Sequence, residues 1–282
     1  MRTGHSVAGL CAAFDVKRSG YYAWAKAGAG ARQREDADLL PEIRAVHERH
    51  HGRYGAPRIW RDLAAQGHRH GRKRIARLMR AAGLQGLCPR RFVPRTTQSD
   101  HAQPIAPNLL AGRAAPTGPN QTWVTDLTYV RTREGWLYVA VILDLWSRRV
   151  AGWATAPTLH AALAIGALRM AVGNRRPGRG LLHHSDRGSQ YASGEYRALL
   201  AMYGMEPSMS RKGNPYDNAA MESFNATYKR ECVGLAEERG GYTTRAEAEG
   251  EFFVYVETYY NRVRRHSALG YQTPVDFENQ LN

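Results

Sequence analysis

Three acidic residues of this chain, Asp126, Asp186 and Glu222, stand in segments that can bring their side chains together. Asp126 lies within a strand-like run, Q-T-W-V-T-D-L-T-Y-V, and Asp186 ends a short apolar run before Gly188. Glu222 opens a helical segment, and 35 residues separate it from Asp186. Three carboxylates brought together bind divalent metal ions, and two such ions can drive phosphodiester chemistry. The three acids are therefore candidates for a metal-dependent catalytic site.

Each of these acids also has an ordinary structural explanation. Asp126 could hydrogen-bond an adjacent threonine, Asp186 could stabilise the turn before Gly188, and Glu222 could be a first-turn acid favoured by the helix dipole. A charged residue in an otherwise apolar strand is, however, costly to bury unless it is paired or bound to a metal. Because the two strands and the helix can converge at one sheet edge, we expect the three acids to act together.

The helix that carries Glu222 presents further polar groups at helical spacing. Asn218 lies four residues before Glu222, Asn225 three after it and Lys229 seven after it. At 3.6 residues per turn these residues share one face. A face with two amides, one acid and one cation suits a metal, a scissile phosphate and an adjoining DNA strand. A solvated helix face is the alternative interpretation.

The run His183-His184-Ser185-Asp186 contains the residue types of a Ser/His/Asp hydrolase. Adjacent residues of a strand point to opposite faces of the sheet, so these four cannot form a relay with one another. The chain also lacks the G-x-S-x-G turn of such hydrolases. We therefore expect the two histidines to pack or to hydrogen-bond near the acids.

Positive charge is concentrated at the N-terminus of the 282-residue chain. Residues 1–100 hold 20 Lys or Arg and 8 Asp or Glu, whereas residues 101–282 hold 20 and 17. This uneven distribution is typical of nucleic-acid binding, with a solubilising surface as the alternative. The strongest candidate element is a basic amphipathic helix from residue 72, and its predicted DNA-binding residues are Arg72, Lys73, Arg74, Arg77 and Arg80.

Apolar periodicity and turn residues predict an α/β fold: a mixed sheet with flanking helices, preceded by an all-helical, helix-turn-helix-type region. The predicted helices are two within 5–26, then 38–52, 57–65, 72–83, 159–172, 193–203, 217–235 and 244–262. The predicted strands are 121–131, 136–144, 148–154, 181–185 and 206–209. The predicted domains are an N-terminal helical segment (1–35), a basic helical domain (36–88), a proline-rich linker (89–118) and a catalytic core with C-terminal helices (119–282).

Other sequence features exclude several protein classes. The three cysteines are scattered and have no C-x-x-C spacing, which argues against a disulfide framework and for a reducing compartment. The most apolar run, from Leu137 to Trp146, is too short to span a membrane and contains Asp144. No apolar signal-peptide core follows Met1. We therefore expect a cytoplasmic protein, associated with the nucleoid through DNA.

Together, several motifs resemble the OrfB-type transposases of bacterial two-reading-frame insertion sequences, which are relatives of retroviral integrases. These motifs are W-V-T-D-L-T-Y-V, D-L-W-S-R-R-V-A-G-W, H-S-D-R-G-S-Q-Y, N-P-Y-D-N-A-A-M-E-S-F and Y-N-R-V-R-R-H-S-A-L-G-Y-Q-T-P. With Y-G-A-P-R-I and the basic helices that follow it, the resemblance extends over essentially the whole chain.

The resemblance implies a ribonuclease-H-like core with a five-stranded mixed sheet. It implies that Asp126, Asp186 and Glu222 are catalytic and bind two metal ions, Mg²⁺ or alternatively Mn²⁺, and that Lys229 lies near the terminal DNA. The implied reaction is cleavage and transfer of DNA strands at terminal inverted repeats, by a homo-oligomer assembled on DNA. In such elements an upstream frame, OrfA, often supplies a helix-turn-helix and a leucine zipper, either fused to this chain or acting with it.

Two other functions remain open at this stage. A structure-selective nuclease of the same fold would use the same acids and metals but would not need a long basic N-terminal region. A non-catalytic DNA-binding regulator of transposition would need the helices of residues 1–90 but not three convergent acids.

Overall fold

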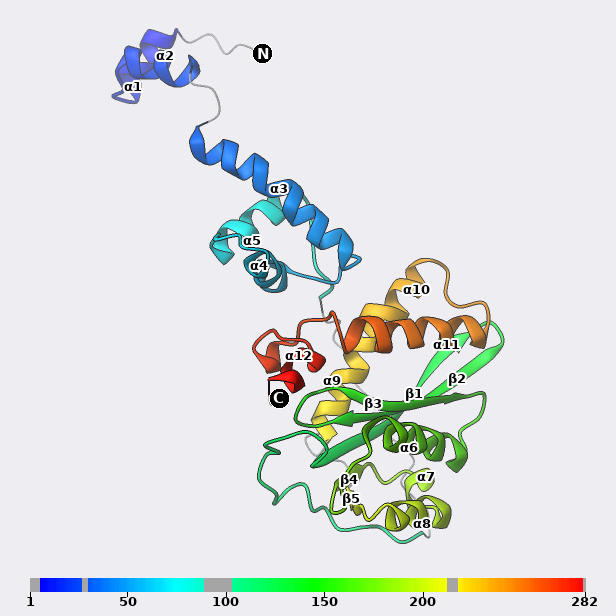
Figure 1. Cartoon of the computed structure of the whole chain (residues 1–282). Helices are drawn as coiled ribbons and strands as arrows, with labels where there is room; N and C mark the ends of the chain where they lie inside the picture. The colour runs from blue at the N-terminus through cyan, green and yellow to red at the C-terminus, as the bar shows by residue number, and fades with distance from the viewer. Residues whose placement is uncertain (1–5, 27–29, 89–102, 212–217, 281–282) are drawn as a thin grey trace. The chain divides into compact units, whose positions relative to one another are not determined.

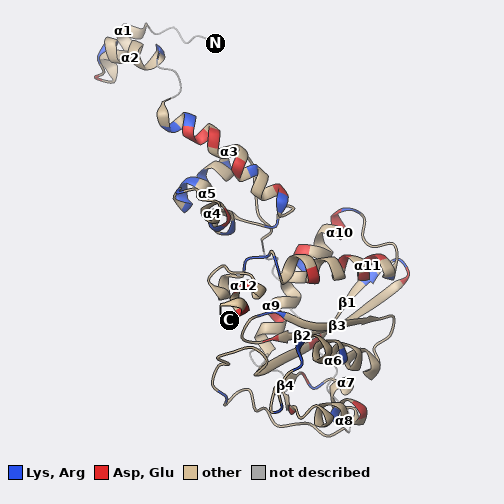
Figure 2. Cartoon of the chain, in the orientation of Figure 1, with Lys and Arg blue, Asp and Glu red and all other residues tan. Residues whose placement is uncertain are grey.

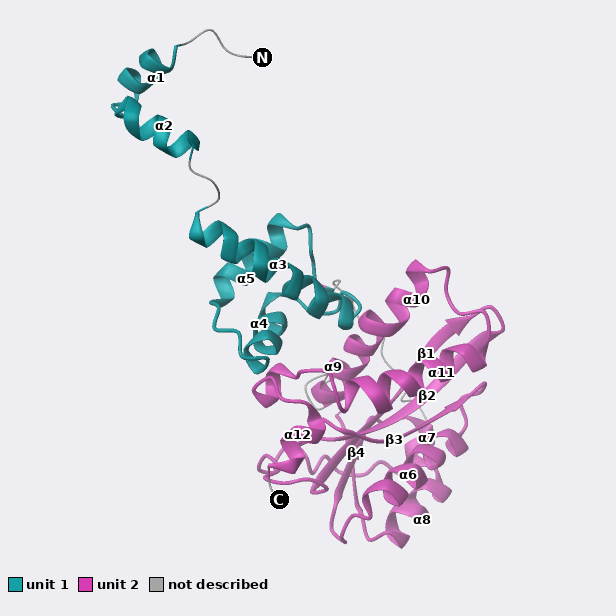
Figure 3. Ribbon diagram, turned by 45° about the horizontal axis from the view of Figure 1, so that its top comes forward, with its two compact units in different colours: residues 1–87 teal, residues 88–282 magenta. Residues whose placement is uncertain are grey.

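The computed structural model describes residues 6–26, 30–88, 103–211 and 218–280. The chain forms two compact units, Met1–Leu87 and Cys88–Asn282, which Figure 3 shows in different colours. The predicted linker lies partly outside the described residues, and its described part, from residue 103, contains neither helix nor strand up to residue 118.

The first unit contains only helices among its described residues. They are α1 (Val7–Ala13), α2 (Arg18–Lys26), α3 (Ala31–Arg49), α4 (Ala56–Ala65) and α5 (Arg72–Ala81). Helices α3, α4 and α5 share one core, in which Ile43, Ile59 and Ile75 are fully buried. The apolar residues whose spacing predicted these helices are therefore the residues that are buried in the core.

One helix boundary in this unit was wrong at the sequence level. Helix α3 begins at Ala31, seven residues before the predicted start at residue 38. Its first turns, A-R-Q-R-E-D-A, contain good helix formers but no apolar residue with a partner in the core, so apolar periodicity could not detect them. The side chain of Gln33 accepts a hydrogen bond from the backbone N–H of Gly30 (3.0 Å) and thereby satisfies a donor at the start of the helix.

The second unit is built on a five-stranded mixed sheet in the order β3-β2-β1-β4-β5. Its strands are β1 (Thr122–Thr132), β2 (Gly135–Asp144), β3 (Val150–Ala156), β4 (Leu182–Ser185) and β5 (Glu206–Met209). The first three strands are antiparallel, whereas β4 pairs in parallel with both β1 and β5. The predicted mixed five-stranded sheet is confirmed.

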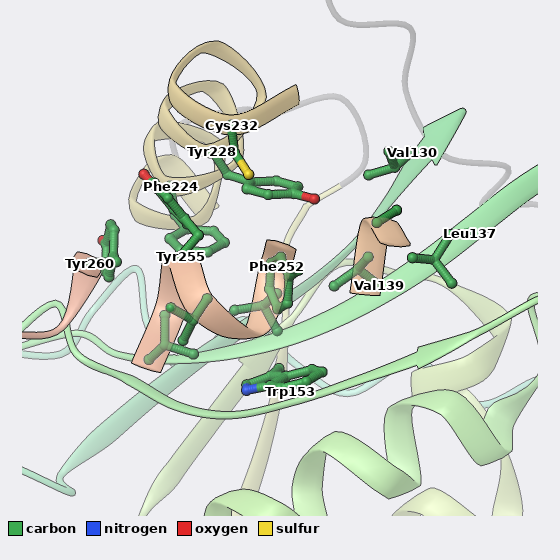
Figure 4. Close-up of a cluster of buried hydrophobic side chains, with 14 of the residues drawn as sticks. Val130, Leu137, Val139, Trp153, Phe224, Tyr228, Cys232, Phe252, Tyr255 and Tyr260 are labelled. Carbon is green, nitrogen blue, oxygen red and sulfur yellow. The ribbon is translucent and has the colours of Figure 1, made fainter. Parts of the chain in front are cut away.

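Helices cover both faces of this sheet (Figure 1). The helical segments of this unit are α6 (Ala161–Arg175), α7 (Ser189–Ala192), α8 (Gly194–Met202), α9 (Ala219–Tyr228), η2 (Lys229–Val233), α10 (Gly234–Glu238), α11 (Arg245–Phe253), η3 (Val254–Tyr260), η4 (Ser267–Leu269) and α12 (Pro274–Asn279). On one face, Val130, Leu137 and Val139 of the β1–β2 hairpin point toward Tyr228 and Phe252 (Figure 4).

Helix α6 covers the opposite face and packs closely against β3. A Cβ atom on Gly152 would lie 2.3 Å from the backbone nitrogen of Ala171 and 2.6 Å from the carbonyl oxygen of Ala167. These distances are far below van der Waals contact, so only glycine permits the observed approach of strand and helix. Gly152 therefore fixes the distance between α6 and the sheet.

The C-terminal helical segments are less regular than predicted. The segment predicted as 217–235 begins in residues outside the described part, and from Ala219 it continues through α9, η2 and α10 to Glu238. Both η2 and η3 are π-helical, and the short helix α12 was not predicted. Local periodicity assumes 3.6 residues per turn, so it predicts a helix at these residues but not the π-helical form of that helix. Within the described residues, no helix is both long and apolar enough to cross a membrane.

Candidate active site

Asp126 and Asp186 lie at the ends of two neighbouring parallel strands. Strand β1 pairs with β4 only from Thr122 to Val124, and Val124 is the partner of His184. Asp126 lies two residues beyond this last pair, and Asp186 directly follows β4. The two aspartates therefore stand level with each other where β1 and β4 cease to pair.

Helix α9 supplies two amides to this position. The Nδ2 atom of Asn225 donates a hydrogen bond to Oδ2 of Asp126 (2.8 Å). Asn218, the residue that precedes α9, donates from Nδ2 to the backbone oxygen of Thr125 (3.2 Å). Two residues of the predicted polar face therefore connect the helix directly to the strand that carries Asp126.

Burial and neighbouring negative charge both act on the carboxylate of Asp126. Burial of its carboxylate and the neighbouring negative charge of Asp186 together raise the pKa of Asp126 to about 7, and Glu222 adds a smaller effect in the same direction. A hydrogen bond from the backbone of Leu127 and the positive charge of Lys229 oppose this shift. The three acids thus interact electrostatically, and a bound cation would relieve the repulsion between them.

The other two acids, Asp186 and Glu222, differ from Asp126 in their surroundings. Asp186 accepts a hydrogen bond at Oδ1 from the backbone N–H of Gly188 (2.9 Å), as the turn explanation predicted. Glu222 lies exposed in the first turn of α9, and partial burial raises the pKa of its carboxyl group. In the parts of the chain that the structure describes, no group of three or more His, Cys, Asp or Glu side chains is close enough to hold a metal ion. The three-acid metal site therefore stays a prediction.

Lys229 links the acids to the outer surface of β1. It follows α9 and opens the π-helical segment η2. Burial lowers the pKa of its ammonium group, while the negative charge of Asp126 acts in the opposite direction. Its Nζ lies 4.8 Å from the centroid of the Tyr129 ring, in a cation–π arrangement.

Two residues beside the acids were not identified from the sequence. The hydroxyls of Tyr191 and Thr125 lie 3.2 Å apart, and Thr125 also donates a hydrogen bond to the backbone oxygen of Val141 (2.8 Å). Burial and the charges of Asp186 and Asp126 raise the pKa of Tyr191, so its hydroxyl stays neutral. Residues 66 positions apart meet here, and no local pattern could have signalled their contact.

The two histidines do not form a catalytic relay with Ser185 and Asp186. His183 hydrogen-bonds the Tyr196 hydroxyl (2.5 Å), and both ring nitrogens of His184 bond to serine hydroxyls (2.8 and 2.9 Å). Burial lowers the pKa of His183 to about 3, so its ring is neutral at physiological pH. Both rings are buried and hydrogen-bonded near the acids, as the sequence predicted.

The basic helix of the first unit divides into two groups of residues. Arg74 and Arg77 bond to the carboxylate of Asp36 (2.6 and 2.5 Å), and Arg74 also bonds to Glu35 (3.0 Å). Arg72, Lys73 and Arg80 are exposed on α5, and Figure 2 shows the basic residues of α3–α5 in blue. Of the five residues on α5 that were predicted to bind DNA, Arg74 and Arg77 thus form ion pairs within the unit.

Comparison with protein families agrees with both units. Models of an integrase core domain match residues 116–215 and 203–274. A model of an HTH-like domain matches residues 33–92. Together, an integrase core domain and an HTH-like domain imply that the chain binds DNA.

Two relatives are similar over nearly the whole chain. The uncharacterized 31 kDa protein of insertion element IS600 from Shigella sonnei is 45% identical over 273 residues, which cover 97% of this chain and 98% of that protein. The transposase InsF for insertion sequence IS3A from Escherichia coli strain K12 is 40% identical over 277 residues, which cover 98% of this chain and 94% of that protein.

Among solved structures, the fold is similar to a chain of the simian T-cell lymphotropic virus intasome in complex with the PP2A regulatory subunit B56 gamma. The TM-score is 0.50 at 15% identity, and the match covers 77% of this chain and 69% of that chain. At this level of identity the match concerns the fold alone. Full-length similarity to InsF and the two integrase core matches show that the chain belongs to the family of insertion-sequence transposases, whose integrase-type core makes it a polynucleotidyl transferase.

Proposed function

We propose that the chain cleaves DNA strands at the terminal inverted repeats of its insertion sequence and joins the freed 3′ ends to target DNA. Asp126, Asp186 and Glu222 are the proposed catalytic acids. The observation that carries this assignment is the electrostatic coupling of the three carboxylates at the point where β1 and β4 stop pairing. Asn225 donates a hydrogen bond to Asp126, and the charge of Lys229 acts on the same carboxylate. Both contacts support a role for the whole α9 face.

The donor set fits hard divalent cations. Carboxylate oxygens are the ligands that Mg²⁺ and Mn²⁺ prefer, and a bound cation would stabilise the buried carboxylate of Asp126 beside the charge of Asp186. We propose that Asp126, Asp186 and Glu222 hold two Mg²⁺ ions. When bound, the ions would activate a water or a 3′-hydroxyl and stabilise the leaving 3′-oxygen.

The neighbouring residues of the chain would orient the acids and the DNA. The amide of Asn225 donates to one oxygen of Asp126 and would restrict the orientation of that carboxylate. Lys229 would contact a phosphate of the terminal DNA, because it places a positive charge beside Asp126. Asn218 holds the start of α9 against β1 and so would position Glu222.

DNA recognition is assigned to the first unit. We propose that Arg72, Lys73 and Arg80, which are exposed on α5, contact phosphates or bases. Arg77 is half-exposed and could turn one guanidinium edge to DNA while it pairs with Asp36. The ion pairs of Arg74 give that residue a structural role in the same helix.

Assembly and location follow from the chemistry. Joining two ends of one element to a target needs at least two catalytic cores held together, so we propose a homo-oligomer on DNA, acting alone or with an upstream-frame OrfA protein. The proposed place of action is the bacterial cytoplasm, at the nucleoid. The division into segments 1–35, 36–88, 89–118 and 119–282 remains our proposal for the domain organisation, except that its first boundary falls within α3 and therefore moves to the start of that helix at Ala31.

A strand-joining assay separates the candidate functions. The full chain is incubated with Mg²⁺, a labelled duplex that ends in the element's terminal repeat, and an unlabelled plasmid. We expect label to become covalently attached to the plasmid. Cleavage without joining would favour the structure-selective nuclease, and metal-independent binding without any nicking would favour the non-catalytic regulator.

A further inference from the structure

Two large aromatic side chains are exposed next to the proposed site. Tyr129 on β1 is 52% exposed and Trp136 on β2 is 44% exposed. Their ring centroids are 5.1 Å apart at an interplanar angle of 83°, an edge-to-face contact. A cross-strand aromatic contact stabilises a hairpin modestly, but it leaves much of both rings in water.

The register of the hairpin determines which face these rings occupy. Tyr129 pairs with Tyr138, and Arg131 pairs with Trp136, so these four side chains lie on one face of the sheet. Val130 and Leu137 point the other way, into the core shown in Figure 4. The aromatic pair therefore belongs to the outer surface of the β1–β2 hairpin rather than to the core.

Positive charge surrounds this aromatic pair. Arg131 and Arg133 are exposed, and Lys229 places its Nζ 4.8 Å from the Tyr129 ring centroid. Glu134, the acid at the turn, accepts a hydrogen bond from the backbone N–H of Arg245 (2.9 Å). Exposed aromatic faces among several cations match a polyanion with flat rings, which is the chemistry of a nucleic-acid strand.

The pair is connected to the acids through Lys229. Asp126, like Val130, points to the face of β1 opposite to Tyr129. Lys229 nevertheless contacts the Tyr129 ring and is electrostatically coupled to Asp126, at the part of β1 that no longer pairs with β4. A DNA strand bound at Asp126 would therefore reach the two rings by passing Lys229 at this unpaired edge of β1.

We propose that Tyr129 and Trp136 form a stacking site for an unpaired base of the DNA strand bound at Asp126. Inside a duplex each base face is covered by its neighbours and the end pair exposes only one face, so an unpaired base offers these rings the most accessible stacking surface. The proposal deepens the proposed function and depends on it, because the DNA must first be bound at the acids. The site would favour a frayed or single-stranded end over a fully paired one.

The test uses the full chain and two DNA probes. One probe is a terminal-repeat duplex with a short 3′ single-stranded extension that carries 2-aminopurine, and the other is the matching blunt duplex with the same label. For the unsubstituted chain we expect tighter binding of the extended probe and quenching of its fluorescence by stacking. Tyr129→Ala and Trp136→Ala should each weaken binding of the extended probe by about 5-fold to 150-fold and abolish the quenching.

Matched variants separate stacking from folding. Tyr129→Phe and Trp136→Phe keep an aromatic ring and should retain the preference and the quenching. Phe253→Ala removes another aromatic that is 49% exposed in the same unit and should leave both signals unchanged. Thermal unfolding of each variant shows whether the hairpin is still folded.

Three outcomes overturn the stacking site. The first is an unchanged preference in both alanine variants while the chain still binds the repeat and cleaves it, which leaves the proposed function intact. The second is that the alanine variants, without DNA, sediment differently from the unsubstituted chain while the quenching is unchanged, which would make the aromatic pair a protein interface. The third is failure of the unsubstituted chain to bind either probe, which would overturn the proposed function as well.

Discussion

At the scale of single residues, Asp126 is the centre of the site. Its pKa is raised to about 7, and its electrostatic neighbours are Asp186, Glu222 and Lys229. Asn225 donates a hydrogen bond to it and so restricts its orientation. The site therefore depends on polar contacts that reach Asp126 from α9 as much as on the acids themselves.

Asn225 offers a residue-scale prediction. Asn225→Ala removes a hydrogen bond to a carboxylate, and such bonds contribute about 1.5–3 kcal/mol. We expect the single-turnover rate of strand cleavage to fall by at least about tenfold, with DNA affinity nearly unchanged. Asn225→Asp should lose more activity, because a further negative charge would face Asp126. Equal rates for both variants and the unsubstituted chain would remove Asn225 from the site.

The sequence predicted some of these residues and not others, for a physical reason. The three acids, Asn225 and Lys229 stand in segments whose local pattern sets their orientation, so they could be proposed together. Thr125 with Tyr191, and Lys229 with Tyr129, are contacts between distant segments. They depend on how the helices pack on the sheet, and a single sequence carries no local signal for that packing.

At the scale of elements, the strands were predicted more closely than the helices. Strand β5 was predicted at the observed residues, Glu206–Met209, although only Ser208 and Met209 in it are buried. Helix ends were less accurate where a helix lacks an apolar face, as at the start of α3, whereas the segments that contain η2 and η3 were predicted as helices. Apolar periodicity thus located the elements that have a buried face, but it could not indicate the start of α3 or the π-helical geometry of η2 and η3.

A prediction at this scale concerns the contact of α6 with β3. Gly152→Ala would place a methyl group against the backbone of α6, and overpacking of this kind costs about 1–3 kcal/mol or more. We expect a loss of at least that size in the free energy of unfolding, measured with urea. Gly173→Ala is the matched control, since no atom lies within 4 Å of a Cβ there. An equal effect of both substitutions would contradict the close approach.

A second element-scale prediction concerns η2, which carries Lys229. Glu231 is buried and accepts two hydrogen bonds from Arg264 (both 2.7 Å) and one from the Tyr255 hydroxyl (3.1 Å). Arg264→Met would leave the buried charge of Glu231 with only the Tyr255 hydroxyl and the more distant Arg230 (3.6 Å), and breaking a buried pair in this way costs up to about 3–5 kcal/mol. The double variant Glu231→Leu with Arg264→Met should recover much of that loss in urea unfolding. A double variant that is still less stable than Arg264→Met alone would show that the charge left on Glu231 does not cause the loss of stability.

A third prediction concerns pH and helix α12. Burial alone would raise the pKa of Glu278, but hydrogen bonds from Arg175, Ser147 and Arg149 outweigh it and hold the pKa below its ordinary value. A lowered pKa in the folded state contributes stability above the unfolded pKa, and that contribution is lost as the pH falls through the folded value.

The matched variant for this effect is Glu278→Gln, which lacks the charge at every pH. We expect the difference in urea midpoint between the two proteins to be largest near neutral pH and to shrink below about pH 4. A difference that stays constant from neutral to acid pH would show that the carboxylate charge does not hold α12.

At the scale of the whole molecule, DNA recognition is proposed for one compact unit and strand cleavage for the other. The first unit carries the exposed cations of α5, and the second carries the sheet and the acids. The strongly basic first hundred residues indicated this division from charge alone. The intramolecular pairing of Arg74 and Arg77 could not be foreseen, because Asp36 lies in the part of α3 that periodicity missed.

Salt dependence tests this division. Arg72→Ala, Lys73→Ala and Arg80→Ala should each reduce the slope of log Kd against log salt by about 0.9 per lost phosphate contact. Arg74→Ala should instead lower the unfolding temperature of the first unit, because it breaks ion pairs with Asp36 and Glu35. Filter binding over a range of salt concentrations provides the slopes. Unchanged slopes in all three exposed variants would move DNA recognition away from α5.

The central claim is that Asp126, Asp186 and Glu222 act as one metal-dependent unit in strand cleavage. The most direct measurement is cleavage of terminal-repeat DNA in Mg²⁺ by Asp126→Asn, Asp186→Asn and Glu222→Gln, with DNA binding measured on the same samples. We predict that each single substitution abolishes cleavage, that combining them has no further effect, and that binding is nearly intact. Mg²⁺-dependent cleavage that persists in any one of the three variants would contradict the claim.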